Sequence, residues 1–207
     1  MDANLILFYQ FATLYSFKLN KYLNYNYFYK KYLNIMEEIS SKQFMINYGL
    51  ITSVILITFG LMLFFLDAHY SQDTFVQITN TVIMCVGITL GCFAFKKANN
   101  NKILGSSVRK IGTGISLIIA IVSVFYTLFI SNVLDAEYWD KVLEISYNQT
   151  LEDNPESLNG MNLNEFIDQS KPLVGYFVYP FIILGTIFFG FLYSVVLALF
   201  IKTKKQL

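Results

Sequence analysis

Four long stretches without a single charged residue limit what this sequence can fold into. They run over residues 43–66, 74–95, 111–134 and 172–201. Each is longer than the ~20 residues that a helix needs to cross the ~30 Å hydrocarbon core of a bilayer. Charged residues make up only 14% of the chain, against roughly 25% in a soluble domain. We therefore predict an all-α integral membrane protein with four transmembrane helices, at about 45–66, 74–95, 111–133 and 173–201.

A basic segment between the second and third spans predicts the orientation. Residues 96–110 contain five Lys or Arg side chains and no acid, which is typical of a loop retained in the cytoplasm. Both termini would then be cytoplasmic, and 13 of the 15 basic residues would lie inside, with 11 of the 14 acids outside. We expect a multi-pass protein of a bacterial inner (cytoplasmic) membrane, with loop 135–171 outside.

Residues 1–35 form an extension that differs from the four-span domain predicted for residues 36–207. They are rich in Tyr, Leu, Asn and Lys and contain neither Gly nor Pro. Their charge-free run, residues 3–17, is too short to span a membrane. The segment is either an amphipathic helix on the membrane surface or upstream sequence that is not translated, and we favour a start at Met36.

Loop 135–171 is the one sizeable polar segment between spans, and its pattern predicts a helical extramembrane hairpin. Tyr138, Val142 and Ile145 recur on one helical face. Asn154-Pro155 is typical of a helix start, Gly160 ends or bends that piece, and a short turn over residues 163–169 leads to Pro172. The only tryptophan, Trp139, suits a membrane interface.

Small residues at helical spacing predict how the spans pack, because close backbone approach drives helix association in lipid. Pro180 predicts a kink in the fourth span. Cys85 and Cys92 are expected to be packing residues, since seven helical residues place them too far apart for a disulfide. The small residues in chain order are Gly49, Ser53, Gly60, Gly87, Gly91, Gly112, Ser116, Ala120, Thr186, Gly190, Ser194 and Ala198.

Residues that could carry chemistry are scarce. No ionisable residue lies in the middle of a span, where a transporter usually keeps one. Asn80 is the most polar side chain there, and we expect an interhelical hydrogen bond rather than a substrate contact. His69, between Asp67 and Asp73, is a weak candidate for a pH-sensitive or metal-binding spot. We assign no catalytic, cofactor-binding or metal-ligand residue, and expect no cofactor and no nucleic-acid partner.

From Met36 onward the chain resembles the domain of unknown function 4199 family of four-span membrane proteins, common in Bacteroidetes. The resemblance rests on NYGLITSVI at the first span, KKANNNKILGSSVRKIGTG before the third, the acidic LDAEYWDKVLE, then Pro172 and a glycine-rich last span ending in KTKK. It covers about residues 43–205. Ala136 stands where family members often have proline. The resemblance implies an inner-membrane location and no known activity, so it transfers no functional residue.

Three classes of function stay open on these grounds. The leading hypothesis is a non-enzymatic accessory or scaffold protein that contacts the bilayer and other membrane proteins, or itself, through small-residue helix faces. The alternative is a small transporter or channel acting as an oligomer, with a wet cavity lined by Asn80 and hydroxyl groups. A membrane enzyme comes third, because it would need a catalytic group that the sequence does not offer.

Overall fold

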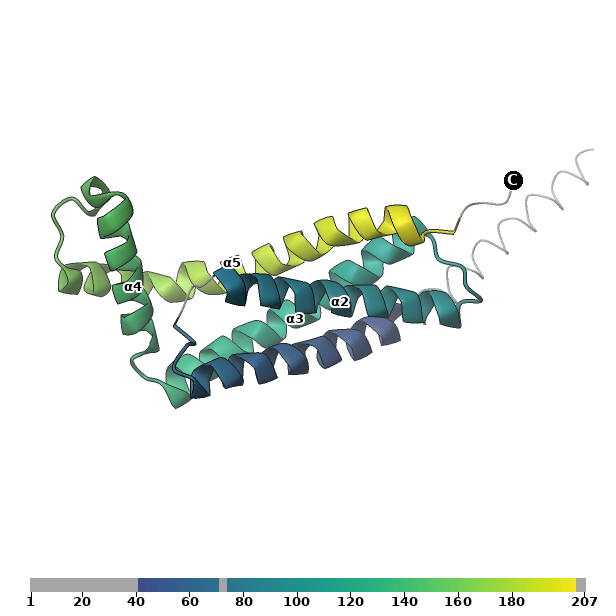
Figure 1. The fold of residues 1–207 in the computed structure, drawn as a ribbon, viewed down its shortest axis with the longest axis horizontal. Helices are drawn as coiled ribbons and strands as arrows, with labels where there is room; N and C mark the ends of the chain where they lie inside the picture. The colour runs from purple at the N-terminus through teal and green to yellow at the C-terminus, as the bar shows by residue number, and fades with distance from the viewer. Residues whose placement is uncertain (1–40, 71–73, 204–207) are drawn as a thin grey trace, which may run out of the picture. The chain divides into compact units, whose positions relative to one another are not determined.

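The computed structural model describes residues 41–70 and 74–203, and the predicted extension 1–35 lies outside them. The described chain is helical, with four helices that are long and apolar enough to cross a membrane (Figure 1). This confirms the predicted all-α, four-span architecture. The elements in order are an unlabelled first helix Ser41–Phe65, α2 Thr74–Ala98, α3 Gly105–Phe129, the π-helical turn η1 Ile130–Leu134, α4 Tyr138–Asp153, the 3-10 turn η2 Pro155–Leu158, and α5 Leu163–Ile201.

The last helix begins ten residues before the predicted fourth span. Instead of a short turn followed by a span from residue 173, α5 is one helix of 39 residues. It begins at a capping box, in which the Asn162 side chain accepts a hydrogen bond from the Glu165 amide and the Glu165 carboxylate accepts one from the Asn162 amide. Because this box satisfies the first free amides of the helix, the helix forms before Pro172 and continues through it and Pro180.

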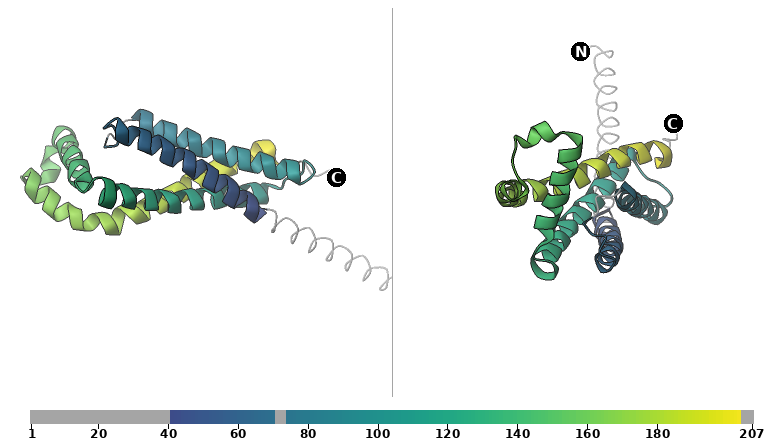
Figure 2. Two further views of the ribbon diagram at one scale, coloured as in Figure 1. Left: turned by 90° about the horizontal axis from the view of Figure 1, so that it is seen from below. Right: turned by 60° about the vertical axis from the view of Figure 1, so that its left-hand side comes forward.

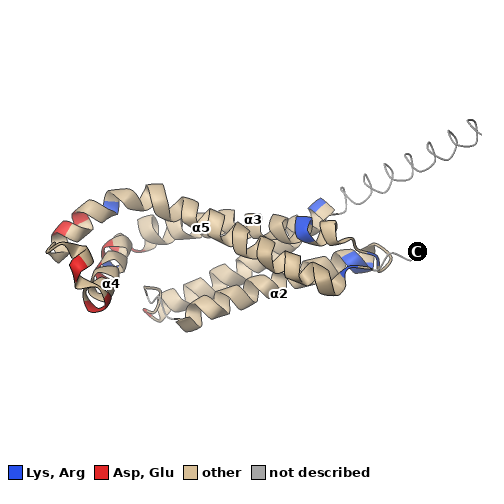
Figure 3. Ribbon diagram, turned by 90° about the horizontal axis from the view of Figure 1, so that it is seen from above, with Lys and Arg blue, Asp and Glu red and all other residues tan. Residues whose placement is uncertain are grey.

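The predicted basic loop is also shorter than expected. Lys96 and Lys97 lie in the last turn of α2, and α3 already begins at Gly105, so only residues 99–104 connect the two helices. In the described chain, Lys and Arg gather at this end of the bundle, and acids gather at the opposite end around α4 (Figure 3). We call these the basic end and the hairpin end.

Short polar contacts close the basic end around the C-terminus of α5. The Lys96 ammonium donates to the Ile201 carbonyl at 3.1 Å. The Thr203 amide donates to the Ile103 carbonyl, and the Ile103 amide donates to the Thr203 hydroxyl, both at 2.9 Å. These bonds tie the α2–α3 connection to the end of the last helix.

Glycine and serine interdigitate between α3 and α5, as the small-residue pattern predicts. A Cβ built on Gly112 would lie within 3.0 Å of the Ser194 side chain, and one built on Gly190 within 3.0 Å of the Ser116 side chain. The two serine hydroxyls donate to the Gly112 and Gly190 carbonyls of their own helices. Both serines are buried, so the two backbones approach closely along a dry seam.

The first helix uses its small residues in the same way. A Cβ on Gly49 would lie within 3.0 Å of Ile118 in α3, and a Cβ on Gly87 of α2 would lie within 3.0 Å of Thr52. The Ser53 and Thr52 hydroxyls donate to carbonyls four residues earlier. Small residues therefore form packing faces rather than a polar path.

The apolar core lies toward the basic end. It includes the fully buried side chains of Ile88, Phe95, Val108 and Ile115. Cys92 belongs to this core and Cys85 is half-buried, and both are free thiols, as predicted. Toward the hairpin end, α2 runs away from α5 (Figures 2 and 3), and α2 has no buried residue before Met84.

Residues 135–171 form the predicted helical hairpin, built from α4, η2 and the first turns of α5. The chain reverses through left-handed residues Asn159 (φ 48°) and Gly160 (φ 77°). The Tyr147 hydroxyl donates to the Met161 carbonyl at 3.0 Å, and its ring lies 5.5 Å from that of Phe166. We call this unit the hairpin.

Candidate functional site

The first helix ends in a turn that folds the following residues back over the bundle. Asp67 adopts a left-handed conformation (φ 54°). Its amide donates to the Phe64 carbonyl, and the Ala68 amide donates to the Leu63 carbonyl at 2.9 Å. This is the Schellman pattern, with Asp67 in the position that glycine usually takes. It places His69 and Tyr70 beside the end of η1.

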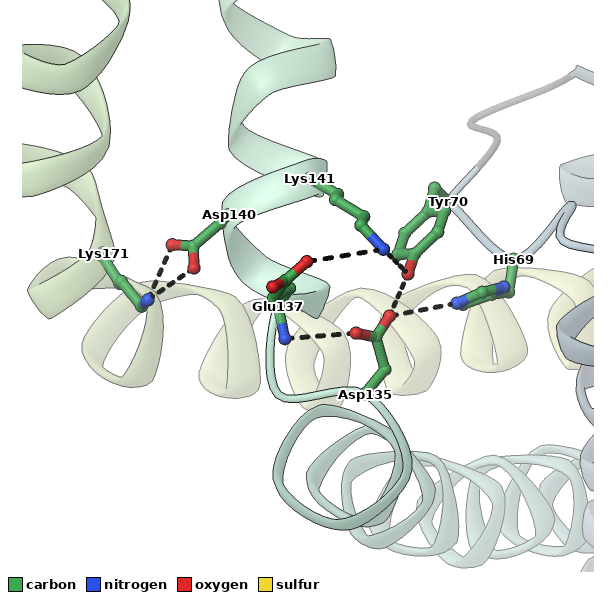
Figure 4. A network of polar contacts seen from close by, with 7 residues as sticks. All are labelled: His69, Tyr70, Asp135, Glu137, Asp140, Lys141 and Lys171. Atoms are coloured by element: carbon green, nitrogen blue, oxygen red, sulfur yellow. Dashed lines mark hydrogen bonds and ion pairs between the residues drawn. The ribbon is translucent and has the colours of Figure 1, made fainter.

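Asp135 is the hub of the polar contacts at the hairpin end (Figure 4). Its Oδ1 accepts a hydrogen bond from the Glu137 amide at 3.1 Å, which fixes the entry into α4. Its Oδ2 accepts a hydrogen bond from the Tyr70 hydroxyl and lies 3.4 Å from His69 Nε2. The His69 and Asp135 side chains are only 9% and 13% exposed. One carboxylate thus joins the connection after the first helix to the start of the hairpin.

Lys141 extends this hub from α4. Its Nζ donates to the Tyr70 hydroxyl at 3.0 Å and lies 4.9 Å from the centre of the Tyr70 ring. It also lies 3.8 Å from the Glu137 carboxylate. A separate ion pair, in which Lys171 donates to Asp140 at 2.6 and 2.8 Å, joins α5 to α4 (Figure 4). Both lysines of the hairpin are therefore used to hold it together.

The charges of the hub favour an ionised Asp135 beside a neutral Tyr70. Burial alone would raise the pKa of Asp135, but hydrogen bonds from Tyr70, His69 and the Glu137 amide, with the nearby Lys141, lower it below the ordinary value. Burial and the bond to Asp135 raise the pKa of the Tyr70 hydroxyl. The bond to Tyr70 raises the pKa of Lys141.

Aromatic rings surround the hub. The His69 ring centre lies 4.8 Å from Phe64 and 3.8 Å from Tyr70, and stacks on Tyr138 at 6.1 Å. His69 Nδ1 is buried and has no hydrogen-bond partner within the described part of the chain. The aromatic contacts continue from Tyr138 to Trp139 at 5.0 Å, and from Trp139 to Tyr179 of α5 at 6.3 Å.

The predicted spot at His69 has a different partner from the one expected. His69 faces Asp135, Asp67 is exposed, and Asp73 lies outside the described residues. No group of three or more metal-ligating side chains occurs in residues 41–70 and 74–203. Asn80 is exposed, and its expected interhelical hydrogen bond stays a prediction.

The sequence reasoning missed Tyr70, Asp135 and Lys141 as a connected set. One local signal was available, since an Asp two residues before a backbone amide often caps a turn, as Asp135 does for Glu137. Its contacts to His69 and Tyr70 join residues more than 60 positions apart. Such contacts depend on the tertiary structure, so no residue spacing along the sequence predicts them.

The hub connects the segment after the first helix to the start of the hairpin, and we call it the joint. Both Asp135 oxygens already accept hydrogen bonds, and Tyr70 both donates to Asp135 and accepts from Lys141. A buried carboxylate with these donors fixes the angle between two segments, because removing any partner leaves an unsatisfied polar group.

The family model described as "Protein of unknown function (DUF4199)" matches residues 47–203, which include the hairpin, the last three spans and all but the first six residues of the first helix. No curated protein and no solved structure matches the chain.

Proposed function

Since the chain belongs to the DUF4199 family of proteins of unknown function, we propose that it is a non-enzymatic accessory protein whose hairpin binds a partner. The observation that carries this proposal is the joint at Asp135, which fixes an acidic hairpin on a membrane bundle. A rigidly held surface binds with a smaller loss of conformational entropy than a mobile loop.

The charges of the hairpin indicate the chemistry of the partner. Residues 135–171 contain nine acids and two lysines, and both lysines are engaged within the joint and the ion pair. Exposed Glu144, Glu152, Asp153 and Glu156 face solvent. A surface with this charge favours a partner segment rich in Lys and Arg.

The orientation belongs to the same proposal. The basic end would be cytoplasmic, in agreement with the positive-inside rule, and the hairpin would face the other side of a bacterial inner membrane. A fluorescent protein fused after residue 207 should then fold and fluoresce in the cytoplasm.

The described packing favours an accessory role over transport. Membrane hydroxyls such as Ser53, Thr89, Ser116 and Ser194 donate to carbonyls of their own helices. The core at the basic end consists of apolar side chains. A transport path would need polar groups free to line it.

The test is cross-linking and affinity purification from native membranes. A C-terminally tagged chain should recover a stoichiometric membrane or extracytoplasmic protein, and high salt should weaken the recovery. The variant Glu152→Lys with Asp153→Lys should lose most of this partner, whereas Lys97→Glu at the basic end serves as the matched control. Equal recovery by the hairpin variant, or recovery of no partner, would refute the proposal.

A further inference from the structure

Three cations from three elements lie together at the basic end, where α3 begins and α5 ends. They are Lys102 in the α2–α3 connection, Arg109 near the start of α3, and Lys202 at the C-terminus of α5. A Cβ built on Gly105 would lie 3.9 Å from the Lys202 Cδ, so the stem of this lysine packs against the start of α3. Arg109 follows Gly105 by four residues and therefore lies on the same helical face. We call these three residues the cation cluster.

Hydrogen bonds at the end of α5 hold Lys102 close to Lys202. Ile103 and Thr203 are joined by two hydrogen bonds of 2.9 Å, and each directly follows one of the two lysines in the chain. All three residues of the cluster are exposed. The cluster is therefore an accessible surface on segments whose backbones are bonded to one another.

The positive charge of the cluster is not neutralised within the described chain. No Asp or Glu of residues 41–70 and 74–203 lies at the basic end (Figure 3). The hairpin end differs, because Lys141 and Lys171 each lie within 4 Å of a carboxylate there. Like charges that are held close together attract an anion.

The cluster lies at the level of the lipid headgroups. The charge-free stretch 111–134 begins two residues after Arg109, and the stretch 172–201 ends directly before Lys202. The face of α5 below Lys202 is apolar and exposed, because Phe188, Phe191 and Leu199 precede it by 14, 11 and 3 residues and are 59%, 42% and 65% exposed. An occupant that contacts both surfaces needs an anionic head and an apolar tail.

We infer that the cation cluster binds the headgroup of an acidic phospholipid whose acyl chains lie along this face of α5. The Arg109 guanidinium can donate two parallel hydrogen bonds to phosphate oxygens, while Lys102 and Lys202 act as point charges. Basic surfaces between helices on the cytoplasmic side are suited to such headgroups. The cluster lies at the end of the bundle opposite the hairpin, so this inference does not depend on the accessory function.

The experiment measures lipid binding to the purified full chain by native mass spectrometry from detergent micelles. The probes are phosphatidylglycerol and phosphatidylcholine with the same acyl chains. Phosphatidylglycerol should bind more tightly, because only this lipid carries a net negative charge. Arg109→Gln should weaken its binding by about 5-fold, and Arg109→Gln with Lys202→Gln by about 5- to 30-fold. Binding of phosphatidylcholine should change little in either variant.

Lys97→Gln is the matched control, because it removes one exposed cation from the same end. Lys97 follows the buried Phe95 by two residues and so lies on the opposite side of α2 from the core. It should therefore affect phosphatidylglycerol binding less than Arg109→Gln does. Circular dichroism should show the same helix content in all variants.

Three results would overturn the inference. The first is equal affinity of the wild-type chain for the two lipids. The second is an equal loss of phosphatidylglycerol binding in Lys97→Gln and Arg109→Gln. The third is displacement of phosphatidylglycerol by soluble glycerol 3-phosphate, which would show that the cluster takes a free phosphate rather than a lipid.

Discussion

Replacing Gly190 by alanine probes the seam between α3 and α5 most directly. The new methyl group would lie within 3.0 Å of both the Cβ and the Oγ of Ser116. Ser116 is buried, and its hydroxyl is bonded to the Gly112 carbonyl. The clash can therefore be relieved only if the two helices move apart.

The expected magnitude follows from a comparison within the same helix. Overpacking of this kind costs about 1–3 kcal/mol, while Gly→Ala in a helix gains up to about 1 kcal/mol from propensity. Gly175→Ala is the matched control, because its Cβ would meet nothing within 4 Å. The propensity gain is shared, so Gly190→Ala should be less stable than Gly175→Ala by about 1–3 kcal/mol.

Reversible unfolding in detergent micelles, followed by circular dichroism, measures this difference. The second variant moves the glycine to the facing helix by combining Gly190→Ala with Ser116→Gly, an exchange of the small position across the seam. Because the exchange returns the missing space, it should recover most of the lost stability, less about 0.5 kcal/mol for glycine in α3. The close-packed seam would be refuted if Gly190→Ala matched Gly175→Ala, or if the exchange gave no recovery.

Further predictions concern the joint and the cysteines. Asp135→Asn should speed amide hydrogen exchange in the first turn of α4 by about 5- to 100-fold, equivalent to about 1–3 kcal/mol, whereas the exposed Asp168→Asn should not. The folded pKa of Asp135 is lowered, so its contribution is present above the ordinary carboxylate range near pH 4 and is lost as the pH falls through the folded value. The protection factors of the α4 amides, which correct for the pH dependence of intrinsic exchange, should therefore fall below about pH 4 in the wild type but stay flat in Asp135→Asn. A membrane-permeant maleimide should modify half-buried Cys85 well before buried Cys92, which mass spectrometry of the labelled protein can follow.

The spans were predictable because their signal lies along the chain. A charge-free window of sufficient length permits only one structure in lipid, and small residues four apart, such as Gly112 and Ser116, mark the face that packs. Helix ends were less accessible. The capping box of Asn162 and Glu165 could be recognised in the sequence. Pro172 nevertheless suggested that the last helix starts later, because proline is common in the first turn of a helix.

The joint could not be predicted from the sequence. His69 stood out as the only histidine, but the partner that the described structure gives it is Asp135, 66 positions away, rather than nearby Asp67. Asp135 reaches it only because the turn at Asp67 and the π-helical end of α3 bring two distant segments together. The exposure of Asn80 could not be predicted either. A hydrophobic pattern indicates which face of a helix is apolar, but it does not indicate where two helices diverge.

The unbroken course of α5 has a mechanical consequence. At ~1.5 Å per residue its 39 residues form a rod about 58 Å long, with one end in the hairpin and the other bonded to Lys96 and followed by Thr203, which bonds to Ile103. Because α5 is continuous, a force applied to the hairpin would be transmitted along this one helix to the basic end. Bending would concentrate near Pro172 and Pro180, where the backbone hydrogen-bond ladder lacks a donor.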